Sequence, residues 1–193
     1  MLIRSFPEPD IPLELLAQVR DLQREAWPGH SFPAPDGGGP SHDPALAPRS
    51  MILLDGDTVV AALDILSKPL THAGHRFRAA GLSTVVTRKA ARGRGHGRHL
   101  VTAAHEAIAD AGFDLALFTC DRPLQGFYES AGWSMIPGAV LVGGTPQAPF
   151  PSDQPGFDKV TMGDFLSSEG RARRLSFHHA RIGLHPGEID RLW

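Results

Sequence analysis

Residues 92–98, with the sequence Arg-Gly-Arg-Gly-His-Gly-Arg, combine the residue types that bind phosphate. Alternating glycines let a backbone turn sharply and direct successive N–H groups at one point. A helix that we expect to begin near Gly97 would add the positive end of its dipole. The residues concerned are Arg92, Gly93, Arg94, Gly95, His96, Gly97 and Arg98. We expect a pyrophosphate-bearing ligand here, because arginines and free amides together match such an anion.

The spacing of these glycines excludes two common phosphate sites. A dinucleotide fingerprint needs GxGxxG, but Arg98 stands where the third glycine would follow Gly93 and Gly95. A nucleoside-triphosphate loop needs GxxxxGK[ST], and the sequence has no Gly-Lys pair.

The elements around the loop set where it lies. A Val-rich strand precedes it and an amphipathic helix follows it. FDLALFT then reads as a strand buried on both faces, and RPLQGFYESAGW as a short helix that ends at Gly132, before a strand from Trp133. The simpler interpretation is an ordinary βαβ unit, in which the glycines only permit a tight connection.

The pattern RxxGxG, formed by Arg92, Gly95 and Gly97, resembles the acetyl-coenzyme A signature of the GNAT-type N-acetyltransferases. The helix with Phe127 and Tyr128 is similar to that family's closing element. The resemblance implies an α/β (α+β) fold: a mixed, mostly antiparallel central sheet, flanked by helices on both faces and split at the acetyl-CoA site. It also implies acetyl transfer from acetyl-CoA to a primary amine in a ternary complex.

The resemblance assigns roles along the central strand. Main-chain groups of Val85, Val86 and Thr87 would contact the pantetheine, and an amide near Val86 would hold the thioester carbonyl. Tyr128 matches the tyrosine that serves as general acid to the leaving thiolate. The alternative for Tyr128 is that its ring only packs behind the loop.

Within this family the outer parts of the chain are similar to the aminoglycoside 2'-N-acetyltransferases, which would imply a role in antibiotic resistance. The final residues GEIDRLW match the ending of those enzymes, in which the terminal carboxylate reaches the acceptor. Trp193 could equally be a plug that docks the tail. The chain departs from that subgroup at Ser83, which stands where the subgroup has a glutamate base.

Candidate acceptor-binding residues lie mainly in the loops and the tail. They are Asp43, Ser83, Asp153, Glu188, Asp190 and Trp193. Gathered together, the acids would attract a small cationic acceptor, although each alone is more often a solvated charge. The alternative acceptors are protein N-termini or lysines. A different class is a non-catalytic acyl-CoA sensor, which the absence of a base at Ser83 favours.

Composition bounds the remaining possibilities. We expect one N-acetyltransferase domain over 1–193, with its core at 51–136, a Pro/Gly-rich loop at 28–50 and a C-terminal extension at 164–193. A net charge of −2 argues against nucleic-acid binding. The chain has no 18-residue apolar run and no signal-peptide pattern, so we expect a cytoplasmic protein without membrane contact. Homodimers are frequent in this family, but no surface demands one.

Single residues complete the predictions. The lone cysteine, Cys120, ends an apolar strand and is interpreted as a small core residue rather than a reactive thiol. His96, His99 and His105 are interpreted as exposed helix residues, and no metal site is expected. The basic run Arg171, Arg173 and Arg174 is most simply a solvated face. The loop at 28–50 is either a lid over the substrate or disordered.

Overall fold

A computed structural model describes residues 1–29 and 39–193 of the chain. The part of the expected 28–50 loop that falls on 30–38 lies outside the described residues, so neither interpretation of that loop is decided. Its later part contains a short 3-10 turn, Pro44–Leu46, and the start of a strand at Arg49.

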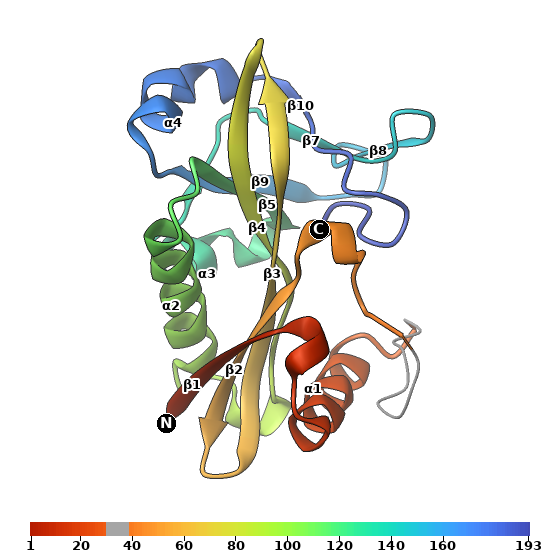
Figure 1. Cartoon of the computed structure of the whole chain (residues 1–193), viewed down its shortest axis with the longest axis vertical. Helices are drawn as coiled ribbons and strands as arrows, with labels where there is room; N and C mark the ends of the chain where they lie inside the picture. The colour runs from red at the N-terminus through yellow and green to blue at the C-terminus, as the bar shows by residue number, and fades with distance from the viewer. Residues whose placement is uncertain (30–38) are drawn as a thin grey trace.

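A mixed sheet of seven strands forms the centre of the molecule, in the order β1-β2-β3-β4-β5-β9-β6 (Figure 1). The strands are β1 Leu2–Pro7, β2 Arg49–Asp55, β3 Thr58–His72, β4 His75–Thr87, β5 Leu115–Asp121, β6 Ser134–Met135 and β9 Lys159–Phe165. Neighbours are antiparallel except for β4 and β5, which are parallel. The predicted mostly antiparallel sheet is confirmed.

Two hairpins build the long strands of this sheet. β2 and β3 are joined through Gly56, which has a φ of 58°, in the left-handed region that glycine adopts without strain. β3 and β4 are joined by Ala73 and Gly74, both with positive φ. Positive φ at both central residues suits the type I′ turn, whose twist matches that of the flanking strands.

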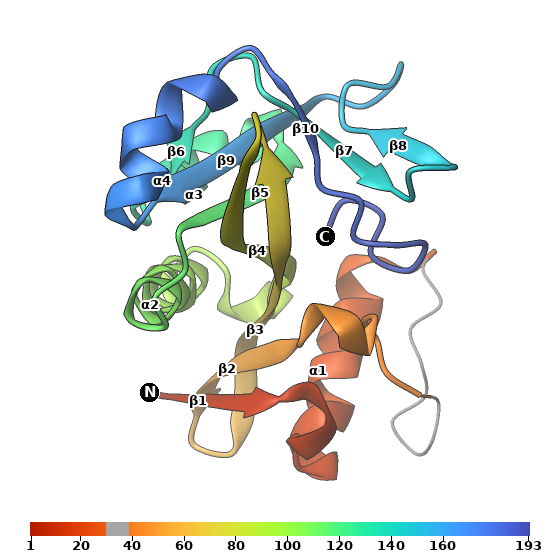
Figure 2. The ribbon, with the colours of Figure 1, turned by 45° about the horizontal axis from the view of Figure 1, so that its top comes forward.

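Helices cover both faces of the sheet (Figures 1 and 2). α1, Leu13–Ala26, buries Val19 and Leu22 in one apolar cluster, whereas α2, His96–Asp110, buries its apolar face in the other. Alternate residues of β2 divide between them: Ile52 faces the α1 cluster and Leu53 the α2 cluster. This alternation is the period of a strand, and it places the core on both sides of β2–β4.

β4 and β5 separate soon after they meet. Their pairing covers only Ala79 with Leu115 and Ala80 with Ala116. Beyond these pairs the indole of Trp193 lies between the strands, where its Nε1 donates a hydrogen bond of 2.7 Å to the carbonyl oxygen of Leu117. A Cβ at Gly81 would lie 2.3 Å from that indole nitrogen, so the absence of a side chain there admits the ring. The split in the sheet lies where the sequence predicts it.

The later part of the chain adds a three-stranded sheet beside the main one (Figure 2). Its strands are β7 Val140–Gly144, β8 Pro149–Pro151 and β10 Arg181–Gly183. A long loop, which contains the short β8, joins β7 to β9 of the main sheet. The basic run lies in and directly after α4, Ser168–Arg173, where Arg171, Arg173 and Arg174 are exposed, as expected of a solvated face. Among the described residues, no helix is both long and apolar enough to cross a membrane.

Candidate active site

The phosphate loop connects β4 to α2. Gly93 and Gly95 have φ values of 76° and 81°, in the left-handed region that glycine adopts without strain. Gly97 lies in the first turn of α2 and meets a different requirement: a Cβ there would lie 2.7 Å from Oγ1 of Thr87. The first two glycines therefore shape the turn, while Gly97 lets α2 approach the end of β4.

The start of α2 presents unpartnered amides. Its N-cap residue, Gly95, supplies no side-chain cap, and the first three N–H groups of a helix have no partner inside it. The side chains of Arg92, Arg94 and Arg98 are exposed around this end. Together with the positive end of the helix dipole, these groups have the donors and the charge that the predicted anion site requires.

A donor pocket of about 850 Å³ extends from this loop along β4. Its lining includes all of the predicted cofactor-binding residues: Val85, Val86, Thr87, Arg92, Gly93, Arg94, Gly95, His96, Gly97 and Arg98. The other walls are the end of α1 and the short helix α3, Gln125–Glu129. The cavity therefore begins at the phosphate loop and continues along β4 to α3.

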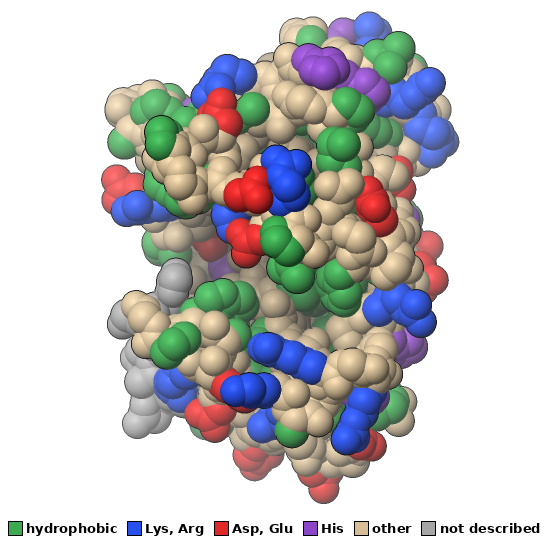
Figure 3. All heavy atoms as spheres, turned by 180° about the vertical axis from the view of Figure 1, so that it is seen from behind, with side chains coloured by type: hydrophobic (Ala, Val, Ile, Leu, Met, Phe, Trp, Pro, Cys, Tyr) green, Lys and Arg blue, Asp and Glu red, His purple; other side chains and the backbone are tan. Residues whose placement is uncertain are grey.

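A second cavity of about 750 Å³, here called the acceptor pocket, lies on the far side of the split. It is enclosed by β4, β5 and the segment 189–193. The two pockets share four lining residues, Trp27, Val85, Leu124 and Tyr128, which mark where they meet. Seen from behind, the molecule is hollowed across its middle, and hydrophobic side chains gather in and around the hollow (Figure 3).

A β-bulge lies in β4 at this meeting point. Ala62 of β3 pairs with Val86 and Asp64 pairs with Ser83, so two residues of β4, Thr84 and Val85, lie opposite one residue of β3. Thr84 has a φ of 47°, which is rare for a β-branched residue. A bulge interrupts the ladder and leaves backbone groups without strand partners. The bulge therefore places unpaired backbone beside Val85 and Val86, where the sequence predicts main-chain contacts.

Tyr128 is 6% exposed at the junction of the two pockets. Its ring packs edge-on against Phe118 and Phe127, with centroid distances of 4.9 and 5.0 Å. Burial raises the pKa of the Tyr128 hydroxyl, with further contributions from Cys120 and Asp121. The packing of its ring agrees with the alternative that Tyr128 packs behind the loop. The residue also lines both cavities, as a general acid must.

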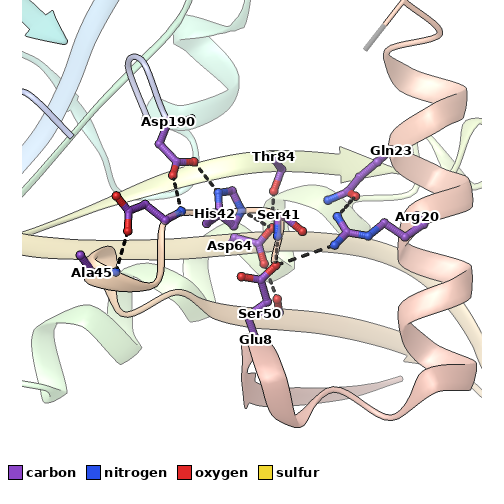
Figure 4. Close-up of polar contacts among 11 residues, drawn as sticks. Glu8, Arg20, Gln23, Ser41, His42, Ala45, Ser50, Asp64, Thr84 and Asp190 are labelled. Carbon is purple, nitrogen blue, oxygen red and sulfur yellow. Dashed lines mark hydrogen bonds and ion pairs between the residues drawn. The ribbon is translucent and has the colours of Figure 1, made fainter. Parts of the chain in front are cut away.

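His42, which no pattern in the sequence singled out, is 2% exposed and lies between two carboxylates (Figure 4). Its Nδ1 is 2.5 Å from Oδ1 of Asp190, and its Nε2 is 3.1 Å from Oδ2 of Asp64. Asp64 also accepts hydrogen bonds from the hydroxyls of Ser50 and Thr84. The cluster joins the described end of the 28–50 loop, β3, the bulge in β4 and the C-terminal segment.

Hydrogen bonds and ion pairs within this cluster determine the charges of His42 and Asp64. Burial alone would lower the pKa of His42, but its hydrogen bonds to Asp190 and Asp64 prevail and raise the pKa to about 10. Burial alone would raise the pKa of Asp64, but the contacts with His42, Ser50 and Thr84 lower it. At neutral pH His42 is therefore an imidazolium ion, and Asp64 is ionised.

One feature of the sequence points toward this cluster. Asp64 is the only charged residue in the apolar run TVVAALDIL, and a carboxylate on a buried strand needs a partner. The partner itself could not be identified, because His42 lies 22 residues away and Asp190 lies 148 residues from His42.

The structure brings only some of the predicted acceptor-binding residues together. Ser83, Asp190 and Trp193 line the acceptor pocket, whereas Asp43, Asp153 and Glu188 do not. Asp153 is paired with Arg181 at 2.7 Å, and Glu188 lines a smaller cavity beside β8. The carboxylate of Asp43 accepts from the amide of Ala45 and caps a 3-10 turn. The expected gathering of acids is therefore reduced to Asp190.

Trp193 is 7% exposed and lines the acceptor pocket as well as filling the split between the strands. The segment that carries it is held at several points. Nζ of Lys68 donates to the carbonyls of Leu184 and His185, and the amide of Gly144 donates to the carbonyl of Arg191. The burial of the indole agrees with the plug interpretation, while its place in the pocket wall allows contact with an acceptor.

Cys120 and the helix histidines lie near the site without forming a reactive centre. Burial raises the pKa of the Cys120 thiol to about 11, as expected for a core residue. Two residues correct the interpretation of exposed helix histidines. His96 is partly buried, and His105 is partly buried, 2.8 Å from Asp164 and edge-on to Trp133, whereas His99 is exposed. Within residues 1–29 and 39–193 no group of His, Cys, Asp and Glu side chains has the arrangement of a metal site.

Comparison with known proteins establishes the family. The chain belongs to the acetyltransferase (GNAT) domain family, whose model matches residues 12–136. No protein of curated function matches the sequence.

Solved structures agree in fold. Escherichia coli ElaA is 18% identical, with a TM-score of 0.59 over 84% of this chain and 97% of that chain. The N-acetyltransferase YhbS of Escherichia coli, in complex with CoA, is 16% identical with a TM-score of 0.60 over 94% of this chain and 87% of that chain. An aminoglycoside 6'-N-acetyltransferase complexed with coenzyme A is 16% identical with a TM-score of 0.59 over 86% and 98%.

The protein is thus an N-acetyltransferase of the GNAT fold that uses acetyl-CoA as its acyl donor. The predicted superfamily, fold class and cofactor are confirmed. The predicted likeness to the 2'-N-acetyltransferases is not confirmed, since the aminoglycoside enzyme found among these structures acts at the 6' position.

Proposed function

We propose that the protein acetylates a primary amine of a small molecule bound in the acceptor pocket, with acetyl-CoA bound in the donor pocket. The observation that carries this proposal is the junction of the two cavities at Trp27, Val85, Leu124 and Tyr128. An amine in one cavity can meet a thioester in the other only at this junction. Direct attack in a ternary complex follows from such an arrangement.

The donor pocket suits coenzyme A by its shape and charge. The amides at the start of α2 and the side chains of Arg92, Arg94 and Arg98 would hold the pyrophosphate. The close approach of Gly97 to Thr87 keeps this end of the pocket free of a side chain. When bound, acetyl-CoA supplies the activated acetyl group. Backbone groups freed by the bulge near Val85 and Val86 would hold the pantetheine and polarise the carbonyl.

Tyr128 is the proposed general acid. As the new C–N bond forms and the C–S bond breaks, its hydroxyl donates a proton to the departing sulfur. Burial raises its pKa, which keeps the hydroxyl protonated before the reaction. The same apolar surroundings destabilise a thiolate, as the raised pKa of Cys120 shows. The pKa of the Tyr128 hydroxyl and the pKa of the departing thiol therefore rise together.

His42 is not the base of this reaction at neutral pH, because its pKa of about 10 keeps it protonated. Its proposed role is to position Asp190, which lines the acceptor pocket. The carboxylate of Asp190 would face the acceptor amine, and water in the pocket would carry the amine proton to solvent. This arrangement accounts for activity without the glutamate that Ser83 replaces.

An aminoglycoside is one candidate acceptor. Its support is the likeness in fold to the 6'-N-acetyltransferase and the position of Asp190 and Trp193 in the acceptor pocket. Acetylation at the 2' position has only the sequence resemblance of the tail as support. A cytoplasmic location and a homodimer also remain predictions from the sequence.

Thiol release from acetyl-CoA tests the proposal. The purified protein is assayed with simple amines, aminoglycosides and peptides, and binding of coenzyme A is measured separately by thermal shift. Thiol release with a small amine supports the proposed function. Turnover with peptides alone would assign a protein acetyltransferase, and coenzyme A binding without any turnover would assign a sensor.

A further inference from the structure

Both carboxylates that line the acceptor pocket are already paired with a cation. Asp190 contacts His42 at 2.5 Å, and Asp121 accepts a hydrogen bond from Nζ of Lys159 at 2.8 Å. Asp121 and Lys159 are also directly opposed on the antiparallel strands β5 and β9. Arg191 brings a further cation to the lining. His42 also pairs with the ionised Asp64, so the described side chains in and beside this lining balance: three acids, Asp64, Asp121 and Asp190, face three cations, His42, Lys159 and Arg191. These side chains therefore offer no excess negative charge to a second ammonium group.

The rim of the same pocket is apolar and exposed. Leu124, Phe157 and Ile189 line it and are 45%, 38% and 64% exposed. They come from three separate parts of the chain: the turn before α3, the loop before β9 and the C-terminal segment. Figure 3 shows hydrophobic side chains on both sides of the hollow on this face. Exposed large apolar side chains that gather around one cavity indicate a ligand surface.

The deeper wall is aromatic. Phe118, Tyr128 and Trp193 line the pocket below the rim, and Trp27 lies where it meets the donor pocket. The indole of Trp193 is fixed by its hydrogen bond to Leu117, so the wall has a defined position. A planar or branched apolar group has contact surface in this pocket from the rim to the junction.

We propose that the acceptor is a primary amine with one positive charge and an aromatic or alkyl body, rather than a polycation. This inference rests on the proposed function and specifies its substrate class. The amine lies at the junction beside Asp190, and the apolar body lies against Phe157, Ile189 and Trp27. Two observations of different kinds agree on this: the neutralised charges of the pocket and its apolar rim.

A matched pair of amines tests the inference. Hexylamine and 1,6-diaminohexane have the same six-carbon chain, and only the second carries a further ammonium group. We expect kcat/KM to be at least about tenfold higher for hexylamine, because the second ammonium loses water against apolar side chains. Along the series from butylamine to hexylamine, kcat/KM should rise about fourfold for each methylene that becomes buried. An equal or higher kcat/KM for the diamine, or for an aminoglycoside, would overturn the inference.

Substitutions in the pocket lining test whether the preference for hexylamine arises in the acceptor pocket. Ile189→Ser and Phe157→Ser should each flatten the dependence on chain length. Leu175→Ser is the matched control, because Leu175 is 65% exposed and lines neither pocket. Lys159→Gln frees Asp121 and should improve the diamine relative to hexylamine by about twofold to fivefold. An unchanged chain-length dependence in both serine variants, together with an unchanged ratio of diamine to hexylamine in Lys159→Gln, would contradict the assignment to this pocket.

Binding separates this inference from the proposed function. Calorimetry measures the affinity of hexylamine and of 1,6-diaminohexane for the protein saturated with coenzyme A. Tighter binding of hexylamine supports the inference even where no amine gives thiol release, a result that would overturn only the proposed enzyme activity. Tighter binding of the diamine would overturn the inference whether or not turnover occurs.

Discussion

The imidazole of His42 lies 2.5 Å from the carboxylate of Asp190, across 148 residues of sequence. Its other ring nitrogen contacts Asp64 on β3, and the amide of Asp43 donates to the second oxygen of Asp190 at 2.9 Å. This contact holds the C-terminal segment against β3. It therefore determines where Asp190 and Trp193 enter the acceptor pocket.

The charge of His42 should make stability depend on pH. Its pKa rises from 6.5 to about 10 on folding, so the ionic contact contributes fully below pH 6.5 and is lost as the pH rises toward 10. We expect the free energy of unfolding to fall across this window by several kcal/mol. Urea unfolding at pH 6.5, 8 and 10 measures it. His42→Gln should remove most of this slope, and an unchanged slope would show that other groups cause it.

The buried pair of Glu8 and Arg20 should contribute more to stability than an exposed ion pair on α1, the helix that carries Arg20. Their side chains are 8% and 3% exposed and lie 3.8 Å apart, and Oε1 of Glu8 also accepts from the amide of Ser41 at 2.6 Å (Figure 4). Glu8→Ala leaves the buried Arg20 guanidinium without its nearest counter-charge, which should cost about 3–5 kcal/mol of unfolding free energy.

Asp21→Ala provides the control for this experiment. Asp21 and Arg24 are 2.9 Å apart but largely exposed, so their loss should change stability by less than about 1 kcal/mol. Equal effects of the two substitutions in urea unfolding would contradict the importance of the buried pair.

Gly97→Ala should weaken binding of coenzyme A. The added Cβ would lie 2.7 Å from Oγ1 of Thr87, so α2 must move away from β4 and the amides at its start move with it. We expect at least a tenfold rise in the Kd for coenzyme A, measured by calorimetry. Gly126→Ala is the control, because a Cβ at Gly126 meets no atom within 4 Å.

A second substitution tests the cause of that effect. Thr87→Ala removes the atom that the new Cβ meets, so the double variant with Gly97→Ala should recover much of the affinity. A double variant that binds no better than Gly97→Ala alone would show that the contact with Thr87 is not the reason.

Trp193→Ala should impair the acceptor more than the donor. The indole fills the split beside Gly81 and lines the acceptor pocket, while the donor pocket does not include it. We expect a rise in the KM for the amine of at least about tenfold, with the Kd for coenzyme A changed less than threefold. Loss of a buried Trp should also lower stability by about 3–5 kcal/mol, so both constants are measured well below the unfolding temperature. Equal effects on donor and acceptor would contradict the placement of Trp193.

Local patterns made much of the fold and the donor pocket predictable. The turn at Asp55-Gly56, the helix after Gly97 and the buried strand before Cys120 each follow from neighbouring residues. The phosphate loop is predictable for the same reason, since its glycines and arginines are contiguous in the sequence. The wall of the donor pocket then follows from the strand that precedes the loop.

The acceptor pocket was less predictable because distant segments build it. Nothing near Asp121 indicates that Lys159 neutralises it, since that pairing depends on β9 lying beside β5. Likewise, the sequence does not show which acids in the later part of the chain are buried in the site. Asp190 contacts His42 in the interior, while Asp153 pairs with Arg181 on the surface. The role proposed for Tyr128 as general acid came only from the family resemblance, and the burial of its side chain was visible only in the structure.

The most direct test of the central claim compares Tyr128→Phe with the unchanged protein. Steady-state thiol release is measured with the best amine found, and the Kd for coenzyme A is measured in parallel. We expect kcat to fall about 10²-fold to 10⁴-fold with the Kd changed less than twofold, because only the donated proton is lost. An unchanged kcat in the variant would contradict the assignment of Tyr128 as the acid at the junction of the two pockets.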